Sequence, residues 1–301
     1  MVDIISPELF RLKILFSMKA KIVTFLMSVA VCYSCAGADK KEIKASEIIK
    51  LVKDGKPVQM VDKIILDDLD FTTSVEPYIV TANMLQCDIP SNIFFEGCVF
   101  MGKVTSNSKN EKTKSPVHSC FRSNLVFTGC DFRGEVDFNG AVVFGMVNFN
   151  RSVFRAKACF NNIAVWAKDC SFSEMNTEKE FMMISASFAG NIDIIGSVFS
   201  GNTSFQLTSV KGTLMFRNSS FKDRAGLDLM ETGGDAFFNN VTFAKTANFS
   251  WSRFMNTVNF SNATFEDKAN FEKTFFLNTV NFEGIDRTRL ILTDTFFLIT
   301  E

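Results

Sequence analysis

Residues 247–271 read ANFSWSRFMNTVNFSNATFEDKANF, and Phe recurs in this stretch at alternating spacings of five and six residues. Each Phe is therefore eleven residues away from the next Phe but one, and such a fixed period is typical of a repeat structure. Extended in both directions, this spacing gives two interleaved columns of mostly Phe. One column is Ile194, Phe205, Phe216, Leu227, Phe238, Phe249, Phe260, Phe271 and Phe282, and the other is Phe188, Phe199, Val210, Phe221, Thr232, Phe243, Phe254, Phe265 and Phe276.

An earlier block of the chain has the same period. Phe160 and Ile194 are 34 residues apart, which is one more than three periods of eleven, so the register changes between the two blocks. We expect the insertion in the polar segment 173–180. The earlier columns are Phe127, Phe138, Phe149 and Phe160, and Phe121, Phe132, Val143, Phe154 and Val165.

This spacing excludes both an α-helix and a flat strand. At about 100° per residue, steps of five and six put successive Phe side chains on opposite sides of a helix. An odd step also alternates faces in a flat strand. The pattern fits a chain that turns a corner between Phe residues, with four short strands closing a coil of about 22 residues. We therefore predict an all-β parallel solenoid with a core of Phe127, Phe138, Phe149, Phe160, Phe205, Phe216, Phe238, Phe243, Phe249, Phe254, Phe260, Phe265, Phe271, Phe276 and Phe282.

The repeated unit is a small residue, then Asn or Asp, then Phe, as in Ala247-Asn248-Phe249 and Val147-Asn148-Phe149. It resembles the pentapeptide-repeat family, and in particular the Phe-rich branch in which five- and six-residue units alternate. The resemblance covers about residues 121–282 and implies a right-handed quadrilateral β-helix. It carries over no catalytic residue, because the motif residues of the family are structural. Thr232 departs from the apolar pattern and implies a local distortion.

The start of the chain has the pattern of a signal peptide. Within residues 18–38, a short basic region precedes the apolar run 22–34, which is too short to span a bilayer comfortably, and Ala36-Gly37-Ala38 ends the segment. We predict export to the periplasm, cell surface or exterior with removal of residues 1–38, of which 1–17 precede a second start at Met18. One alternative is lipoprotein processing at Cys35, and another is a buried hydrophobic helix.

The repeats, at 84–283, are expected to lie between two terminal segments. Residues 39–83 are predicted to form an N-terminal cap, with a helix in 45–57 that Ser46 caps, followed by an extended segment. The tail 284–301 leaves the repeat, and we expect it to cover the last coil. The alternative is a homodimer face, because an open coil end is a template for pairing.

Two polar interruptions of the repeat are candidate sites. We interpret 101–119 as a disordered surface loop, and the alternative is a recognition loop with Lys103, Lys109, Lys112 and Lys114. His118, the only His, is interpreted as an ordinary residue of that loop. The stretch 226–236 is interpreted as a turn, although metal binding by Asp228, Glu231 and Asp235 is the alternative. No metal, cofactor or catalytic group is predicted.

Six cysteines follow residue 38, and the sequence does not define a disulfide pairing for them. Cys98 and Cys130 precede a Phe by two residues, where small inward residues belong, and Cys170 does the same if Phe172 points inward. Cys120 and Cys159 directly precede a Phe, which places them on the outer face.

Charge and composition favour a binding module. Without residues 1–38 the chain has 28 basic and 31 acidic residues, a net charge of −3, so bulk charge indicates neither nucleic acid nor an anionic membrane as a partner. We predict a noncatalytic scaffold or protein-binding module of the cell envelope, with an unknown protein or envelope partner and no transmembrane segment after signal removal. The alternatives are a DNA mimic that binds a type II topoisomerase, as some pentapeptide-repeat proteins do, and a carbohydrate-active β-helix enzyme.

Overall fold

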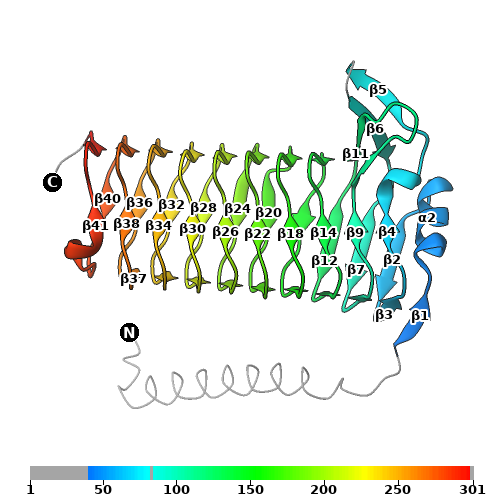
Figure 1. Cartoon of the computed structure of the whole chain (residues 1–301), viewed down its shortest axis with the longest axis horizontal. Helices are drawn as coiled ribbons and strands as arrows, with labels where there is room; N and C mark the ends of the chain where they lie inside the picture. Colours follow the sequence, from blue (N-terminus) through cyan, green and yellow to red (C-terminus); the bar gives the residue numbers. More distant parts are fainter. Residues whose placement is uncertain (1–39, 82–83, 299–301) are drawn as a thin grey trace, which may run out of the picture. The chain divides into compact units, whose positions relative to one another are not determined.

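The computed structural model describes residues 40–81 and 84–298. The predicted signal segment, including Cys35, lies outside the described residues. From Lys41 onward the chain winds through four β-sheets that form the four sides of a solenoid (Figure 1). In the described part of the chain, no helix has the length and apolar character needed to cross a membrane.

Sheets A, B and C have 10 strands each, and sheet D has 12. Sheet A contains β1 (Lys41–Ile43), β3 (Lys63–Ile65), β8 (Val99–Phe100), β13 (Asp131–Phe132), β17 (Val153–Phe154), β21 (Asn176–Thr177), β25 (Val198–Phe199), β29 (Ser220–Phe221), β33 (Thr242–Phe243) and β37 (Thr264–Phe265). Sheet B contains β2 (Val58–Val61), β7 (Ile93–Glu96), β12 (Leu125–Thr128), β16 (Val147–Asn148), β20 (Asp169–Ser171), β24 (Asn191–Asp193), β28 (Leu214–Met215), β32 (Ala236–Phe237), β36 (Val258–Asn259) and β40 (Val280–Asn281). Sheet C contains β4 (Leu69–Asp70), β9 (Val104–Thr105), β14 (Val136–Asp137), β18 (Ala158–Cys159), β22 (Phe181–Met182), β26 (Thr203–Ser204), β30 (Ala225–Gly226), β34 (Ala247–Asn248), β38 (Ala269–Asn270) and β41 (Leu290–Ile291). Sheet D contains β5 (Tyr78–Thr81), β6 (Met84–Ile89), β10 (Asn107–Lys109), β11 (Pro116–Phe121), β15 (Val142–Val143), β19 (Ala164–Val165), β23 (Ser187–Phe188), β27 (Ser209–Val210), β31 (Glu231–Thr232), β35 (Arg253–Phe254), β39 (Phe275–Phe276) and β42 (Phe296–Phe297).

The chain visits the sheets in the order B, A, C, D and then returns to B one coil further on. Successive strands in a sheet pair in parallel, so that Ala225 pairs with Ala247 of the next coil. Ala247 pairs in turn with Ala269 at the same offset along the chain, which is twice the period of the Phe columns. These pairings confirm the predicted parallel solenoid and the predicted length of its coil. The right-handed sense of the coil stays a prediction.

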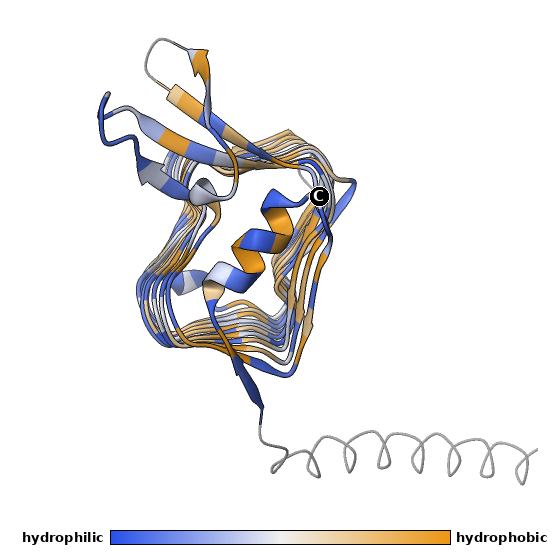
Figure 2. Cartoon of the chain, turned by 90° about the vertical axis from the view of Figure 1, so that its right-hand side faces the viewer, coloured by the Kyte–Doolittle hydropathy of each residue, from blue (hydrophilic) through white to orange (hydrophobic). Residues whose placement is uncertain are grey.

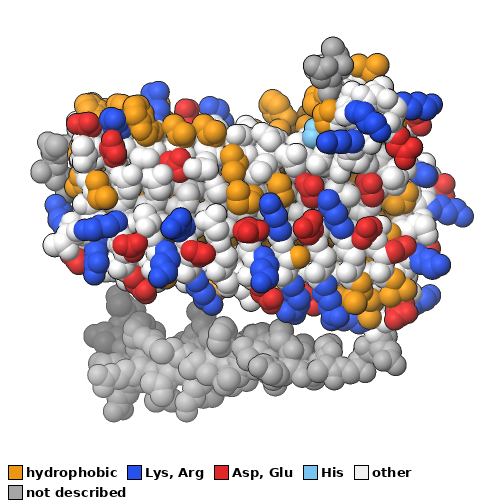
Figure 3. Space-filling model, in the orientation of Figure 1, with side chains coloured by type: hydrophobic (Ala, Val, Ile, Leu, Met, Phe, Trp, Pro, Cys, Tyr) orange, Lys and Arg blue, Asp and Glu red, His pale blue; other side chains and the backbone are white. Residues whose placement is uncertain are grey.

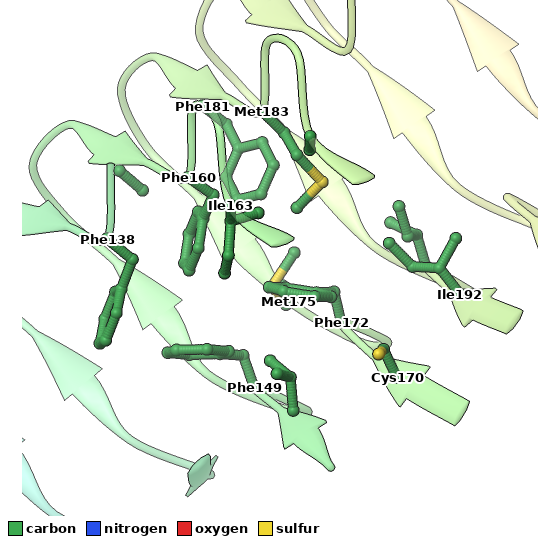
Figure 4. Close-up of a cluster of buried hydrophobic side chains, with 14 of the residues drawn as sticks. Phe138, Phe149, Phe160, Ile163, Cys170, Phe172, Met175, Phe181, Met183 and Ile192 are labelled. Atoms are coloured by element: carbon green, nitrogen blue, oxygen red, sulfur yellow. The ribbon is translucent and has the colours of Figure 1, made fainter. Parts of the chain in front are cut away.

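The solenoid is filled by Phe rings that stack from coil to coil. The ring centroids of Phe249 and Phe271 are 4.8 Å apart with planes 5° from parallel. Edge-to-face contacts join these stacks across the interior, as between Phe249 and Phe260 at 5.4 Å. The close-up in Figure 4 shows rings from several coils meeting in this way. The predicted core Phe residues are all buried except Phe282, which is partly exposed in the last described coil.

The register change lies at 166–169, so its expected place in 173–180 is wrong. Val142 pairs with Ala164 at the regular offset, whereas the offset between Val147 and its partner Cys170 is longer by one. The extra residue therefore lies at the corner between Val165 and Cys170. The pattern misplaced it because the Phe columns fail just afterward. Phe181 takes the inward position that Ala158 holds one coil earlier.

The segment 101–119 is ordered, so its interpretation as a disordered loop is wrong. Its first part forms β9, a regular strand of sheet C. Its second part forms the antiparallel hairpin of β10 and β11, and β5 and β6 form a second antiparallel pair beside it. Together these strands project from the solenoid near its N-terminal end (Figure 1). His118 belongs to strand β11 and not to a loop.

A short helix covers the first coil, as predicted. Helix α2 (Ala45–Lys53) buries Ile48, Ile49 and Val52 in the solenoid core, and it lies across the end of the square in Figure 2. The prediction that Ser46 caps it is wrong, because the helix begins at Ala45 and its N-cap residue is Lys44. The Ala45 N–H donates to the Asp67 carboxylate at 2.6 Å, so a neighbouring segment satisfies the first turn.

The tail continues the solenoid instead of leaving the repeat. After the short 3₁₀ helix η2 (Arg287–Arg289), strand β41 pairs with β38 and β42 pairs with β39. Ala269 pairs with Leu290 at an offset that is shorter than the regular one, so the coil has lost one residue. As far as residue 298, the tail is therefore a further part of a coil and not a cover over the end. A second 3₁₀ helix, η1 (Phe71–Thr73), precedes the projecting strands.

Polar side chains secure the corners between the strands. Where Asn precedes a core Phe, its side chain accepts a hydrogen bond from the backbone two residues on, as Asn259 does from the Ser261 N–H at 2.8 Å. Buried hydroxyls join neighbouring coils. Ser252 donates to the Leu227 carbonyl at 2.8 Å and accepts from the Met230 N–H at 3.0 Å. Backbone groups at these corners are therefore satisfied inside an apolar core.

Thr232 occupies a Phe position, between Val210 and Phe254 in sheet D, and is fully buried. Its hydroxyl has no hydrogen-bond partner among the described residues. We expect Thr232→Val to stabilise the fold by about 1–2 kcal/mol, because an unsatisfied buried hydroxyl is removed with little change of shape. Chemical denaturation measures this.

The matched control is Thr208→Val, since the Thr208 hydroxyl donates to the Met183 carbonyl at 2.6 Å. We expect this second change to destabilise the fold. If both substitutions shift the stability in the same direction, the unsatisfied hydroxyl does not explain the effect.

Candidate interaction surface

The outer face of sheet D and the corners on either side of it carry a group of exposed apolar side chains toward the C-terminal end. Strands β27, β31, β35, β39 and β42 are successive neighbours there, and hydrophobic side chains gather along the upper edge of Figure 3 near that end. We call this group the sheet-D face, and each member is at least 38% exposed. Its members are Leu207, Leu229, Trp251, Met255, Phe275, Phe296 and Leu298.

Three members of the sheet-D face have an unusual backbone conformation. Leu207, Leu229 and Trp251 have φ angles of 58°, 58° and 61°. A positive φ at this turn position favours Gly or Asn and is uncommon for bulky residues. Asn162 occupies the same corner in an earlier coil. The chain therefore keeps large apolar side chains at positions where they cost backbone strain, which is typical of functional positions.

Further contacts show how the face is organised. Phe275 and Phe296 lie next to each other on adjacent strands, with ring centroids 5.9 Å apart. The Lys273 ammonium lies 4.7 Å from the centre of the Trp251 ring. These side chains contact one another while remaining open to solvent. Aromatic residues and Met are the types enriched at protein interfaces.

A second exposed aromatic pair lies nearer the N-terminal end of sheet D. The rings of Phe144 and Trp166 are 6.3 Å apart and nearly parallel. The Arg122 guanidinium lies 4.9 Å from the centre of the Phe144 ring, and Asp88 binds the same guanidinium at 2.7 Å. This pair adds apolar surface to the same side of the solenoid.

The comparisons with known proteins bear on residues in the same region. Residues 233–274 match the family model of pentapeptide repeats, in nine copies. The chain carries pentapeptide repeats. The family resemblance is therefore confirmed for residues 233–274, and two members of the sheet-D face, Trp251 and Met255, lie within the matched repeats. No curated protein and no solved structure matches the chain.

Charged residues of both signs are interspersed on the pentapeptide-repeat solenoid. Arg155 binds Asp131 at 2.7 Å and Glu178 at 2.8 Å, and Lys103 lies 3.4 Å from Asp137. Blue and red side chains are interspersed across the side shown in Figure 3. A DNA mimic needs a continuous acidic surface, and basic side chains interrupt the acidic ones here.

The predicted metal alternative is not supported by the described residues, which contain no group of three or more potential ligands. Asp228 accepts two hydrogen bonds from the Gln206 amide, at 2.9 and 3.0 Å. Glu231 lies 3.7 Å from Lys211. The structure thus gives Asp228 and Glu231 separate partners of their own.

Three aspartates gather beside α2, in a hollow that Lys50 and Lys53 also line. Asp67 accepts from the Ala45 N–H, Asp68 from the Lys103 N–H at 2.7 Å, and Asp70 from the Thr72 N–H at 2.8 Å. Each carboxylate therefore holds backbone of the N-terminal coils in place.

The cysteines have the character of buried core residues. In the described part of the chain, Cys98, Cys130 and Cys170 are buried, as expected for inward positions. Burial raises the pKa of the Cys170 thiol to about 12 and that of Cys87 to about 11, so both are protonated near neutral pH. Cys120 pairs with Asp88 across β11 and β6 and lies close to the ion pair of Asp88 and Arg122, yet it is only 1% exposed.

Sequence reasoning did not identify the sheet-D face, although a signal was present. Leu207, Leu229 and Trp251 each lie two positions after an inward core residue. Asn262 has the same place relative to Phe260, at another corner of another coil. A large apolar residue at a turn position that favours Gly or Asn is the signal.

Proposed function

We propose that this protein is an exported, noncatalytic binding module of the cell envelope that docks a protein partner on the sheet-D face. The pentapeptide-repeat solenoid is a general structural or protein-interaction module, and it presents flat sheets to solvent. The observation that carries the proposal is the exposed column of Leu207, Leu229 and Trp251 at positive φ.

A protein partner fits the chemistry of this face best. Exposed apolar patches with charged neighbours mark binding sites for proteins more often than for polar ligands. Glu231 of β31 pairs with Arg253 of β35, which pairs in turn with Phe275 of β39, so charges of both signs lie beside the apolar residues. The partner surface would then combine apolar side chains with a few groups that complement these charges.

The test uses a variant that removes the apolar surface without strain. Asn tolerates positive φ, so replacing Leu207, Leu229 and Trp251 by Asn is expected to keep or raise the melting temperature. A photoreactive amino acid at Phe275 should crosslink a single envelope protein in intact cells. That crosslink should be lost in the triple Asn variant.

The control places the same photoreactive amino acid at Lys222, an exposed residue that follows a strand of sheet A. No crosslink is expected there. If the same crosslinked protein is found at both positions, or if the crosslink persists in the triple variant, docking on the sheet-D face is contradicted.

Export is proposed from the composition of residues 18–38. Cell fractionation followed by N-terminal sequencing tests it independently of the binding experiment. Cleavage after Ala38 or a lipid-modified Cys35 in the envelope fraction supports export. An uncleaved chain in the cytoplasm contradicts it.

We also propose that two copies associate through their C-terminal ends. Strands β41 and β42 are the last described strands of sheets C and D, and Phe296 and Leu298 are exposed beside them. Sedimentation at increasing concentration should show a dimer, which Leu298→Asp should weaken. A monomer at all concentrations contradicts this contact.

A further inference from the structure

A polar groove lies between the β10–β11 hairpin and the adjoining corner of the solenoid. Its volume is about 600 Å³, which is within the range of small-molecule sites. The pale blue His118 in Figure 3 marks its position at the base of the projecting strands. Among the polar side chains that line it are Lys103, Asn107, Lys109, His118, Asp137 and Asn162.

The position of His118 is fixed by two features of the corner. Its Nδ1 lies 2.9 Å from the Asn139 carbonyl oxygen, which can only accept a hydrogen bond, so Nδ1 carries the proton. Gly140 follows at a φ of 71°, and a Cβ on this residue would overlap the imidazole. The absence of a side chain at Gly140 therefore makes room for the ring. In its neutral form, His118 has a lone pair on Nε2.

The other polar groups in the groove are partly positioned. The Asp137 carboxylate is held by Lys103 and by the Asn107 amide, each at 3.4 Å. The Asn162 amide donates to the Asn139 side chain at 3.0 Å and lines the wall opposite the hairpin. Lys109 is exposed on strand β10 and lines the same space. The groove thus offers cationic donors, amide donors and two acceptors.

We propose that this groove binds an acidic sugar, with its carboxylate at Lys109 and its hydroxyl groups near His118 and Asp137. The polar lining disfavours an apolar ligand, since buried polar groups need hydrogen-bond partners. A hydroxyl group can exchange a hydrogen bond with Nε2 of His118, and the Asp137 carboxylate accepts hydrogen bonds from hydroxyl groups. A hydrogen phosphate dianion brings only one hydroxyl donor, and Asp137 repels its double negative charge. A monoanionic sugar satisfies the donors and the acceptors together.

Isothermal titration calorimetry with a galacturonate oligosaccharide tests this proposal on the full-length protein. Binding should weaken at least about tenfold in Lys109→Met and in His118→Phe, because each removes a group that contacts the ligand. Lys222→Met is the matched control, since this exposed lysine lies outside the groove, and its affinity should be unchanged. Lys109 is also exposed, so its replacement leaves the fold intact and keeps the test valid if His118→Phe is unstable.

Two further titrations separate the alternatives. A neutral oligosaccharide of the same length should bind about tenfold more weakly than the galacturonate probe, because Lys109 then has no carboxylate to pair with. Inorganic phosphate should also bind more weakly. Tighter binding of phosphate, equal binding by all variants, or no heat with galacturonate overturns the proposal.

Discussion

Replacing Phe249 by Asp is expected to destabilise the protein by about 4–5 kcal/mol or more, which is enough to unfold the C-terminal coils. Phe249 is fully buried and stacks on Phe271 at 4.8 Å. Its ring also meets the edges of Phe238 and Phe260, each at 5.4 Å. A carboxylate at this position has no polar partner in the stack and loses the ring contacts of two neighbouring coils.

The measurement must report on individual coils, because repeat proteins need not unfold as one unit. Hydrogen exchange followed by mass spectrometry should show lost protection first in peptides that contain Phe238, Phe260 and Phe271. Peptides from the N-terminal coils, far from the substitution, should keep most of their protection.

The control is Phe275→Asp, which introduces the same charge into strand β39 of sheet D, one coil further on. Phe275 points outward and is 38% exposed, so a carboxylate there remains solvated. We expect less than about 1 kcal/mol of change. Similar losses of stability from both substitutions would contradict the inward assignment of Phe249.

The period of the Phe columns was sufficient to predict the length of the coil, because the stacking of one coil on the next sets both. One turn of the coil brings Ala225 beside Ala247, and the same step along the chain separates stacked rings such as Phe249 and Phe271. Burial of identical residues at a fixed interval therefore reports the length of chain in one turn. The helix over the first coil was likewise predictable, because Ile48, Ile49 and Val52 share one face.

The exceptions arose where one residue type could serve two positions. Phe181 fills a position that holds Ala158 in the preceding coil, and Met183 takes the place of a core Phe. Counting Phe residues therefore misplaced the extra residue, because core volume and not residue identity is maintained along the stack. The β10–β11 hairpin was missed because the polar sequence of β10 lacks the alternation of a half-buried strand.

The candidate surface could not be predicted from the periodic pattern, because the Phe columns describe only the interior. In the sequence, Trp251 and Leu229 differ from Asn262 only in the size and polarity of the side chain. Their positive φ angles become apparent only when the corners are built, and these angles make the apolar side chains costly to keep. The groove around His118 depends in addition on residues from separate coils, Gly140 and Asn162.

Replacing Gly212 by Ala is expected to cost about 2–3 kcal/mol, because the added methyl group overlaps the coil beneath it. Gly190, Gly212 and Gly234 stack at one corner, and the Gly212 N–H donates to the Gly190 carbonyl at 3.1 Å. A Cβ on Gly212 would lie 2.7 Å from the Gly190 carbonyl carbon and would overlap the Asn191 side chain. The backbone of two coils must separate to admit it.

Gly226→Ala is the matched control for this effect. Gly226 lies in strand β30, and a Cβ there would meet only side chains, the nearest at 3.4 Å. We expect a change within about 0.5 kcal/mol or a slight stabilisation, because Ala reduces the freedom of the unfolded chain. Thermal denaturation and hydrogen exchange at residues 190–234 measure both variants. Since the substitutions are identical, a large difference between them isolates the close approach of the coils at Gly212, and equal stabilities would contradict it.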